Sequence, residues 1–170
     1  MYKINRIQLY IALFIAFIAH ITILEHIRLF GAKPDLMLIV TVFSGLFCGS
    51  GIGLEIGIVC GFLKDIYTLD LFWMNTFIMA LSGFLSGVLS TKFSHESKPA
   101  HIYTVFALTL FSACLHFLFA LTFLKTIASY FFEYLWISAL PSAVYTSIIA
   151  IPIFAKGARM YAPEEYDDLI

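Results

Sequence analysis

Long apolar runs are the feature of this sequence that most restricts its fold. The first run, 7–24, contains 18 residues without Asp, Glu, Lys or Arg, and similar runs follow along the chain. A helix needs about 20 apolar residues to cross hydrocarbon about 30 Å thick. Of the 170 residues 61% are hydrophobic and only 12% are charged, whereas soluble domains are about one quarter charged. We therefore predict an all-α integral membrane protein.

The residues between the apolar runs predict six spans in a single transmembrane domain, 1–170. Pro34 and Asp35 indicate a helix start, because proline is tolerated in a first turn and a carboxylate there faces the positive end of the helix dipole. Gly49-Ser50-Gly51 indicates a tight turn between two helices. The first run exceeds the core of a signal peptide, about 7–15 residues, so we expect it to be retained. The expected spans are 7–24, 34–48, 52–69, 72–89, 102–124 and 135–155, followed by a polar tail, 157–170.

The distribution of Lys and Arg predicts the orientation, because cytoplasmic connections of membrane proteins are enriched in these residues. With six spans, one side of the membrane holds six basic residues and the other holds three, when Lys64 is left out as part of a helix. We therefore expect both termini in the cytoplasm, whereas five spans would place them on opposite sides. The six are Lys3, Arg6, Lys92, Lys98, Lys156 and Arg159, and the three are Arg28, Lys33 and Lys125.

The third expected span is unusual because it carries Glu55, Lys64 and Asp65. Nine Ile, Leu, Val and Phe residues in this span contribute roughly −3 to −5 kcal/mol to insertion, while three central charges would cost roughly 8–10 kcal/mol. The span is therefore a poor membrane helix by itself. We expect its neighbours to shield it, or a wet cavity to lie beside it.

Small residues in the third and fourth spans recur every four positions, which places them on one stripe of each helix. Glycine on such a stripe lets another backbone approach closely. We interpret the stripes as helix-packing or partner-interface surfaces, with a lipid or substrate groove as the alternative. The stripe residues are Gly49, Gly53, Gly57 and Gly61, continued by Asp65, in the third span, and Gly83 and Gly87 in the fourth.

Asp65 has two interpretations that the sequence leaves open. It could form a structural ion pair near the outer interface with Lys64, Arg28 or another basic group. It could instead be a buried polar anchor that orients the third helix, or part of a ligand or partner site, since an intramembrane carboxylate is a functional candidate by default. We expect Glu55, nearer the cytoplasmic end, to extend toward the headgroups.

Several function classes are not supported by the sequence. The net charge of −1 argues against a nucleic-acid partner. We expect Cys48, Cys60 and Cys114 to be packing residues, because they form no CxxC pair. His20 and His116 have no metal-site spacing, so we expect each to bond a neighbouring helix. We find no nucleotide-binding or nucleophile motif, and we predict neither an enzyme nor a cofactor site.

Residues 31–90 resemble the MreD family, the small membrane proteins of the bacterial rod-shape system. The likeness is carried by Lys33-Pro34-Asp35-Leu36, which opens the second span, and by Gly57-x3-Gly61-x3-Asp65-Ile66 in the third. This resemblance implies a non-enzymatic scaffold in the bacterial inner membrane that regulates cell shape within the peptidoglycan elongation complex. The implied partners are membrane lipid and an MreC-type protein, and through it MreB, RodA and a class B penicillin-binding transpeptidase.

MreD proteins are also similar in fold to the substrate-binding subunits of energy-coupling-factor vitamin transporters. This second likeness implies an alternative function as a small-molecule or lipid-binding membrane subunit of a transporter. The outer connections of the chain show no obvious cluster of ligand-binding groups, although the small residues for docking a partner are present. Neighbouring genes would discriminate between the two functions. Genes mreB and mreC beside this one would indicate the scaffold, and genes for a pair of ATPases would indicate the transporter subunit.

Overall fold

The computed structural model describes residues 6–22, 33–68, 73–91, 98–123 and 130–161, and these ranges contain helices and no strand. The all-α prediction is therefore confirmed for the described part of the chain. The elements are α1 (Arg6–Thr22), α2 (Leu36–Cys48), α3 (Ser50–Tyr67), α4 (Met74–Ser90), α5 (Lys98–Phe123), α6 (Phe131–Tyr134), a π-helical stretch (Leu135–Ala139) and α7 (Leu140–Tyr161). The connections carrying Arg28, Lys92 and Lys125, and the tail beyond residue 161, lie outside the described residues.

Two of the described helices are long and apolar enough to cross a membrane, by length and composition alone. They are Ala100–Phe123 with 24 residues and Phe131–Lys156 with 26 residues. Three further helices, α1, α2 and α4, are apolar but shorter. A shorter helix reaches across hydrocarbon only where the bilayer thins or flanking residues extend to the headgroups.

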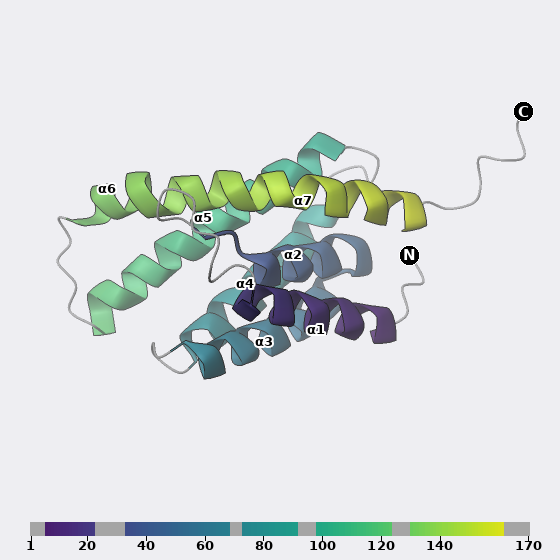
Figure 1. Cartoon of the computed structure of the whole chain (residues 1–170), viewed down its shortest axis with the longest axis horizontal. Coiled ribbons are helices and arrows are strands. Elements are labelled where there is room, and N and C mark those ends of the chain that lie inside the picture. Colours follow the sequence, from purple (N-terminus) through teal and green to yellow (C-terminus); the bar gives the residue numbers. More distant parts are fainter. Residues whose placement is uncertain (1–5, 23–32, 69–72, 92–97, 124–129, 162–170) are drawn as a thin grey trace, which may run out of the picture.

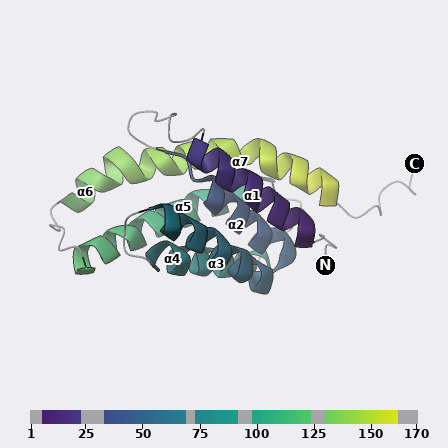
Figure 2. The same cartoon turned by 60° about the horizontal axis from the view of Figure 1, so that its bottom comes forward.

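The helices form two groups that meet along α2, α4 and α5. α3 and α4 make the most extensive contact, α2 packs on both, and α1 lies against α2 (Figures 1 and 2). α5 and α7 pair with each other and reach the first group through α4 and α2. The start of α1 and the end of α7 lie at the same end of the bundle (Figure 1).

α2 is the central helix, and ten of its 13 residues are buried. It is joined to α3 by Gly49, whose φ of 93° is a conformation that glycine adopts without steric strain. Nothing lies within 4 Å of the position that a Cβ would take at Gly49. Gly49 therefore makes the turn, and its carbonyl carbon also lies 2.7 Å from the position that a Cβ would take at Gly87 of α4.

The contact between α3 and α4 is backbone against backbone. A Cβ added to Gly53 would meet the carbonyl of Gly83, and a Cβ added to Gly83 would meet that of Gly53. The same addition to Gly57 would lie 2.9 Å from Cα of Ala80, and at Gly61 it would meet Cα of Thr76. Such an approach is possible only between small residues. Gly87 lies in the same way against Ser50, and Gly45 of α2 lies against Ser86.

The last long helix is interrupted by one wider turn. The amide of Leu140 donates to the carbonyl of Leu135, five residues earlier, which is the π-helical pattern. Pro141 follows directly, and proline has no N–H to continue the regular α-helical bonding. The wider turn thus lies where the α-helical ladder loses a donor, beside the pocket described next.

Candidate functional site

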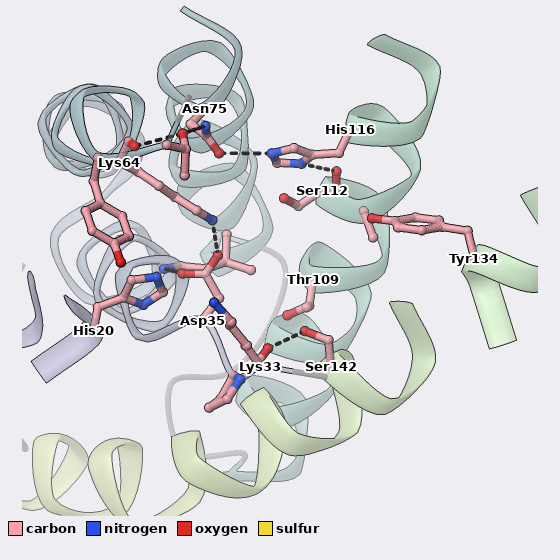
Figure 3. A pocket seen from close by; sticks show the side chains of 15 residues that line it. His20, Lys33, Asp35, Lys64, Asn75, Thr109, Ser112, His116, Tyr134 and Ser142 are labelled. Atoms are coloured by element: carbon pink, nitrogen blue, oxygen red, sulfur yellow. Dashed lines mark hydrogen bonds and ion pairs between the residues drawn. The ribbon is translucent and has the colours of Figure 1, made fainter. Parts of the chain in front are cut away.

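A polar pocket of about 310 Å³ lies between the two groups of helices (Figure 3). α2 and α4 begin beside it and α3 ends beside it, while α5 and the start of the last long helix form the opposite wall. Its ionisable side chains, apart from tyrosines, are His20, Lys33, Asp35, Lys64 and His116. Its further hydroxyl and amide groups include Asn75, Thr109, Ser112, Tyr134 and Ser142.

Asp35 and Lys64 form an ion pair in the pocket wall. Nζ of Lys64 lies 2.6 Å from Oδ2 of Asp35, and each side chain is 16% exposed. The other carboxylate oxygen of Asp35 accepts the amide of Leu38 at 3.1 Å, so Asp35 is also the N-cap of α2. Pro34, directly before it, is buried. The helix start predicted from these two residues is thus followed by α2, which begins at Leu36.

Asp65 lies next to Lys64 in sequence but faces α4. Its side chain is buried, with 4% exposed, and it accepts five hydrogen bonds from residues that open α4. Three of the donors are backbone amides, which have no partner of their own in the first turn of a helix. The donors are the amides of Trp73 at 3.3 Å, Asn75 at 2.9 Å and Thr76 at 2.9 Å, Nδ2 of Asn75 at 2.9 Å and Oγ1 of Thr76 at 2.6 Å.

Trp73 occupies a strained backbone conformation at this cap. Its φ is 122°, in a region that L-residues rarely adopt, and holding a residue there costs about 1–3 kcal/mol. Two contacts fix it: its amide donates to Asp65, and its ring packs edge-on against Phe119 and Phe123 of α5. The Asp65 cap therefore determines how the chain enters α4.

Asn75 connects this cap to the pocket. Its Nδ2 donates to Oδ1 of Asp65, and also to Oγ1 of Thr68 at 3.2 Å. Its Oδ1 lies 2.9 Å from Nε2 of His116, and Nδ1 of His116 lies 2.8 Å from the carbonyl of Ser112 (Figure 3). A chain of hydrogen bonds thus runs from α3 through α4 to α5 along one side of the pocket.

α7 closes the other side through two further bonds. Oγ of Ser142 donates to the carbonyl of Lys33 at 2.7 Å, and the amide of Asp35 donates to Oγ1 of Thr146 at 3.1 Å. The segment directly before α2 is therefore hydrogen-bonded to α7 through the hydroxyl groups of Ser142 and Thr146. A pocket whose walls are cross-linked in this way presents its charged groups in fixed positions.

Glu55, the third charged residue of α3, lies outside the pocket. Oη of Tyr10 donates to Oε1 of Glu55 at 2.5 Å, and Arg6 of α1 lies 3.9 Å from its other oxygen. Its side chain is 39% exposed. The pair with Arg6 thus lies at the end of the bundle where α1 begins.

Sequence reasoning treated the two histidines and Asp35 as separate features, and it did not single out Asn75. The structure brings all four to one pocket (Figure 3). The available signal was a polar amide near the start of an apolar span, ten residues after Asp65, which is the last charge of the preceding span. The charges of that preceding span drew attention instead. Among the described residues, no group of three or more His, Cys, Asp and Glu side chains could hold a metal ion.

The family model described as rod shape-determining protein MreD matches residues 1–156. The chain belongs to the MreD family. The resemblance expected from the motifs at Lys33–Leu36 and Gly57–Ile66 is therefore confirmed, and every residue that lines the pocket lies within the match. Membership assigns the protein to the membrane and to rod-shape determination. No curated protein and no solved structure matches the chain significantly.

Proposed function

We propose that this MreD-family protein is a non-enzymatic membrane scaffold of the peptidoglycan elongation complex, and that its polar pocket receives a segment of an MreC-type partner. The observation that carries the proposal is the pocket itself, whose charged groups are fixed by hydrogen bonds between helices. Through that partner the scaffold connects to MreB, to RodA and to a class B penicillin-binding transpeptidase, with membrane lipid around it.

The hydrogen bonds of His116 favour a binding role over a catalytic one. A general base must keep a ring nitrogen within reach of the proton that it abstracts. In this pocket one ring nitrogen of His116 faces the carbonyl of Ser112 and the other faces the amide oxygen of Asn75. Both nitrogens therefore hold the wall together, and the ring supports a fixed surface for a bound group.

The orientation that we propose places the pocket toward the outer side of the inner membrane. The pocket lies where α2 and α4 begin, at the end of the bundle away from the start of α1 and the end of α7. With both termini in the cytoplasm, that end faces the periplasm. The partner segment would then approach from the periplasmic side, close to the point where the partner leaves the membrane.

Filling the pocket tests the proposal. Ala113 of α5 lines the pocket, whereas Ala107, on the same helix, is exposed outside it. Ala113→Phe should lower co-purification of a co-expressed MreC-type partner by about tenfold or more, since a buried contact worth about 1.4 kcal/mol changes affinity by that factor. Ala107→Phe is the matched control and should bind like the wild type. Equal co-purification by both variants, at equal extracted yield, would contradict the proposal.

The pocket also supports the second candidate, a small-molecule or lipid-binding subunit of a transporter. Its volume of about 310 Å³ lies at the lower end of small-ligand sites, which are about 300–1,000 Å³. This function predicts a compound that co-purifies with the wild type and is lost in Ala113→Phe, together with an ATPase pair in place of an MreC-type partner. Mass spectrometry of the extracted protein distinguishes the two candidates.

A further inference from the structure

The last long helix has two anchors that place it in the membrane. Trp136 lies near its outer end with 68% of its surface exposed, and Lys156, also exposed, lies 20 positions further along. Tryptophan and lysine are typical of the two edges of a span, because the ring and the ammonium group extend to the headgroups. At 1.5 Å per residue the anchors are about 30 Å apart, which is the thickness of the hydrocarbon. Thr146, halfway between them, therefore lies at the middle of the membrane.

The surface of this helix between the anchors fits that placement. Every exposed residue there is apolar, as contact with hydrocarbon requires. These residues are Ile137, Val144, Ile148, Ile151, Pro152 and Ile153.

α2 begins at the depth of Thr146 rather than at a membrane surface. The amide of Asp35, the N-cap of α2, donates to Oγ1 of Thr146 at 3.1 Å. α2 then continues for 13 residues, about 20 Å, and near its end the ring of Phe47 lies 6.0 Å from that of Phe154 in α7. α2 thus crosses only the half of the membrane beyond Thr146. The ion pair between Asp35 and Lys64 consequently lies near the midplane.

The pocket connects this depth with the outer end of the bundle. Along α5 its lining extends from Thr109 to His116, and along the last long helix it extends from Ser142 to Tyr134 (Figure 3). These stretches of helix are about 10 and 12 Å long. One leaflet of the hydrocarbon is about 15 Å thick. The pocket therefore extends through most of the outer leaflet.

The opposite half of the seam between α2 and α7 is filled by aromatic rings. The ring of Phe43 lies 4.6 Å from that of Phe47 and 5.3 Å from that of Phe154, measured between centroids. Leu38, Val42 and Leu46 of α2 are buried beside them. In the described part of the chain the pocket is thus closed toward the cytoplasmic end, which makes it a one-sided shaft rather than a channel.

The ion pair at the floor requires water in this shaft. A Lys or Asp side chain at the centre of a span costs about 2.5–3.5 kcal/mol. Lys64 and Asp35 both line the pocket, and each keeps 16% of its side-chain surface exposed. Hydrocarbon in the pocket would leave these surfaces without polar contacts, whereas water in a roomy polar cavity forms hydrogen bonds with them.

A displaced helix does not account for these contacts equally well. The floor would reach the membrane surface only if the last long helix moved outward by about 15 Å, half of the hydrocarbon thickness. That movement would place Phe132, Trp136 and Ile137 in water, with 70%, 68% and 59% of their surfaces exposed. Contiguous exposed apolar side chains of this kind are unfavourable in water.

We infer that the pocket is a water-filled shaft through the outer leaflet, with the Asp35–Lys64 pair at its floor, and that a partner segment bound at this floor is bound inside the membrane. The outward direction rests on the orientation proposed above, and the depth does not. The partner half of the inference rests on the proposed function.

The depth restricts which part of the partner can reach the floor. The floor lies about 15 Å below the outer edge of the hydrocarbon. A side chain whose backbone lies outside the membrane is too short to cross that distance. An MreC-type partner therefore reaches the floor only with a hydrogen-bonding side chain that its own chain carries into the outer leaflet, in the outer half of its span.

Cysteine labelling measures the depth of the water without any partner. A charged, membrane-impermeant thiol reagent is added to cells with a permeabilised outer membrane, and the labelled peptides are identified by mass spectrometry. Ser142→Cys places a thiol in the pocket, whereas Val144→Cys places one at nearly the same depth on the lipid-facing surface. Ser142→Cys should react at least about tenfold faster, because the reactive thiolate forms in water and not in hydrocarbon.

A second pair of positions leaves the hydrogen bond of Ser142 intact. Ala113→Cys places a thiol in the pocket wall on α5, and the native Cys114, exposed outside the lining, is its control in the same molecule. The introduced thiol should again react faster. Equal rates within both pairs, at equal extracted yield, would overturn the inference. Labelling of the pocket positions from the cytoplasmic side alone, in inside-out vesicles, would overturn it as well.

Disulfide formation with a co-expressed MreC-type partner locates the bound segment. Single cysteines are placed along the outer half of the partner's span and along the residues that follow it. Ser142→Cys should cross-link with positions inside the span, and Val144→Cys should not. Cross-links confined to residues beyond the span would overturn the partner half of the inference. Absence of any cross-link, at wild-type co-purification, would refute entry of the partner into the pocket and with it the proposed function, while the labelling rates still decide whether the shaft exists.

Discussion

Thr76 donates twice to the same oxygen of Asp65, from its backbone amide at 2.9 Å and from its hydroxyl at 2.6 Å. The cap of α4 thus comes from the preceding helix rather than from the residue directly before α4, which is Trp73. This arrangement joins the end of α3 to the start of α4 more firmly than an ordinary N-cap, because one carboxylate serves several amides.

Removal of the Asp65 carboxylate should destabilise the protein. In Asp65→Ala the amides of Trp73, Asn75 and Thr76 lose their acceptor in a buried site, and each unsatisfied group costs about 1–3 kcal/mol. Asp65→Asn keeps one acceptor oxygen but turns an NH₂ group toward donors. Its loss of stability should therefore lie between those of the wild type and Asp65→Ala. The free energy of unfolding in detergent measures both. Wild-type stability of Asp65→Ala would exclude an anchoring role.

Glycine positions on α3 should differ sharply in their tolerance of a methyl group. Gly57→Ala places a Cβ 2.8 Å from the carbonyl carbon of Met79, so the helices must separate, and overpacking costs about 1–3 kcal/mol. Gly51 lies on the same helix with nothing within 4 Å of the Cβ position. Gly51→Ala should therefore be neutral, or stabilising by about 0.5–1 kcal/mol. Thermal stability in detergent compares them, and equal values would contradict direct packing of α3 on α4.

Lys64 and Asp35 should be coupled energetically. Lys64→Met leaves the carboxylate of Asp35 in a mostly buried wall without its cation at 2.6 Å, and breaking such a pair costs up to about 3–5 kcal/mol. Asp35→Asn removes the charge but keeps an oxygen for the amide of Leu38. The double variant should be more stable than Lys64→Met alone, because it leaves no single charge behind. Additive losses in unfolding measurements would show that the pair contributes no coupling.

The orientation can be tested at the C-terminus. Six spans and a cytoplasmic N-terminus predict that green fluorescent protein fused after Ile170 is fluorescent and that a periplasm-active phosphatase at the same position is inactive. Active phosphatase together with a dark fluorescent protein would place the C-terminus in the periplasm and the pocket toward the cytoplasm.

The sequence was sufficient for the fold class and the family, because both depend on local patterns. Uninterrupted apolar runs predicted helices, and the glycine and aspartate spacing of α3 carried the resemblance to MreD proteins. The partner of Lys64 was not predictable from spacing. Adjacent residues on a helix point about 100° apart, since one turn takes 3.6 residues. Asp65 therefore faces α4, while Lys64 reaches Asp35, 29 positions earlier at the start of α2.

The pocket was less accessible to sequence reasoning than the helices. His20, Asn75 and His116 lie in three separate apolar runs, and nothing local relates them to one another. Asn75 and His116 are 41 positions apart, and only the packing of α4 on α5 brings them within hydrogen-bond distance. Long-range contacts of this kind depend on which helices are neighbours, which apolar periodicity does not specify.

The α3–α4 contact also has a consequence for how the protein is made. Chains emerge from the ribosome from the N-terminus, so α3 is synthesised before the helix that shields its carboxylate. The donors to Asp65 come from residues 73, 75 and 76, and Gly57 and Gly61 of α3 have their close backbone contacts with Met74–Ser90. A charged helix without these partners inserts poorly into hydrocarbon. We therefore expect α3 to wait at the translocation machinery until α4 has emerged, and the two to enter the bilayer together as one hairpin.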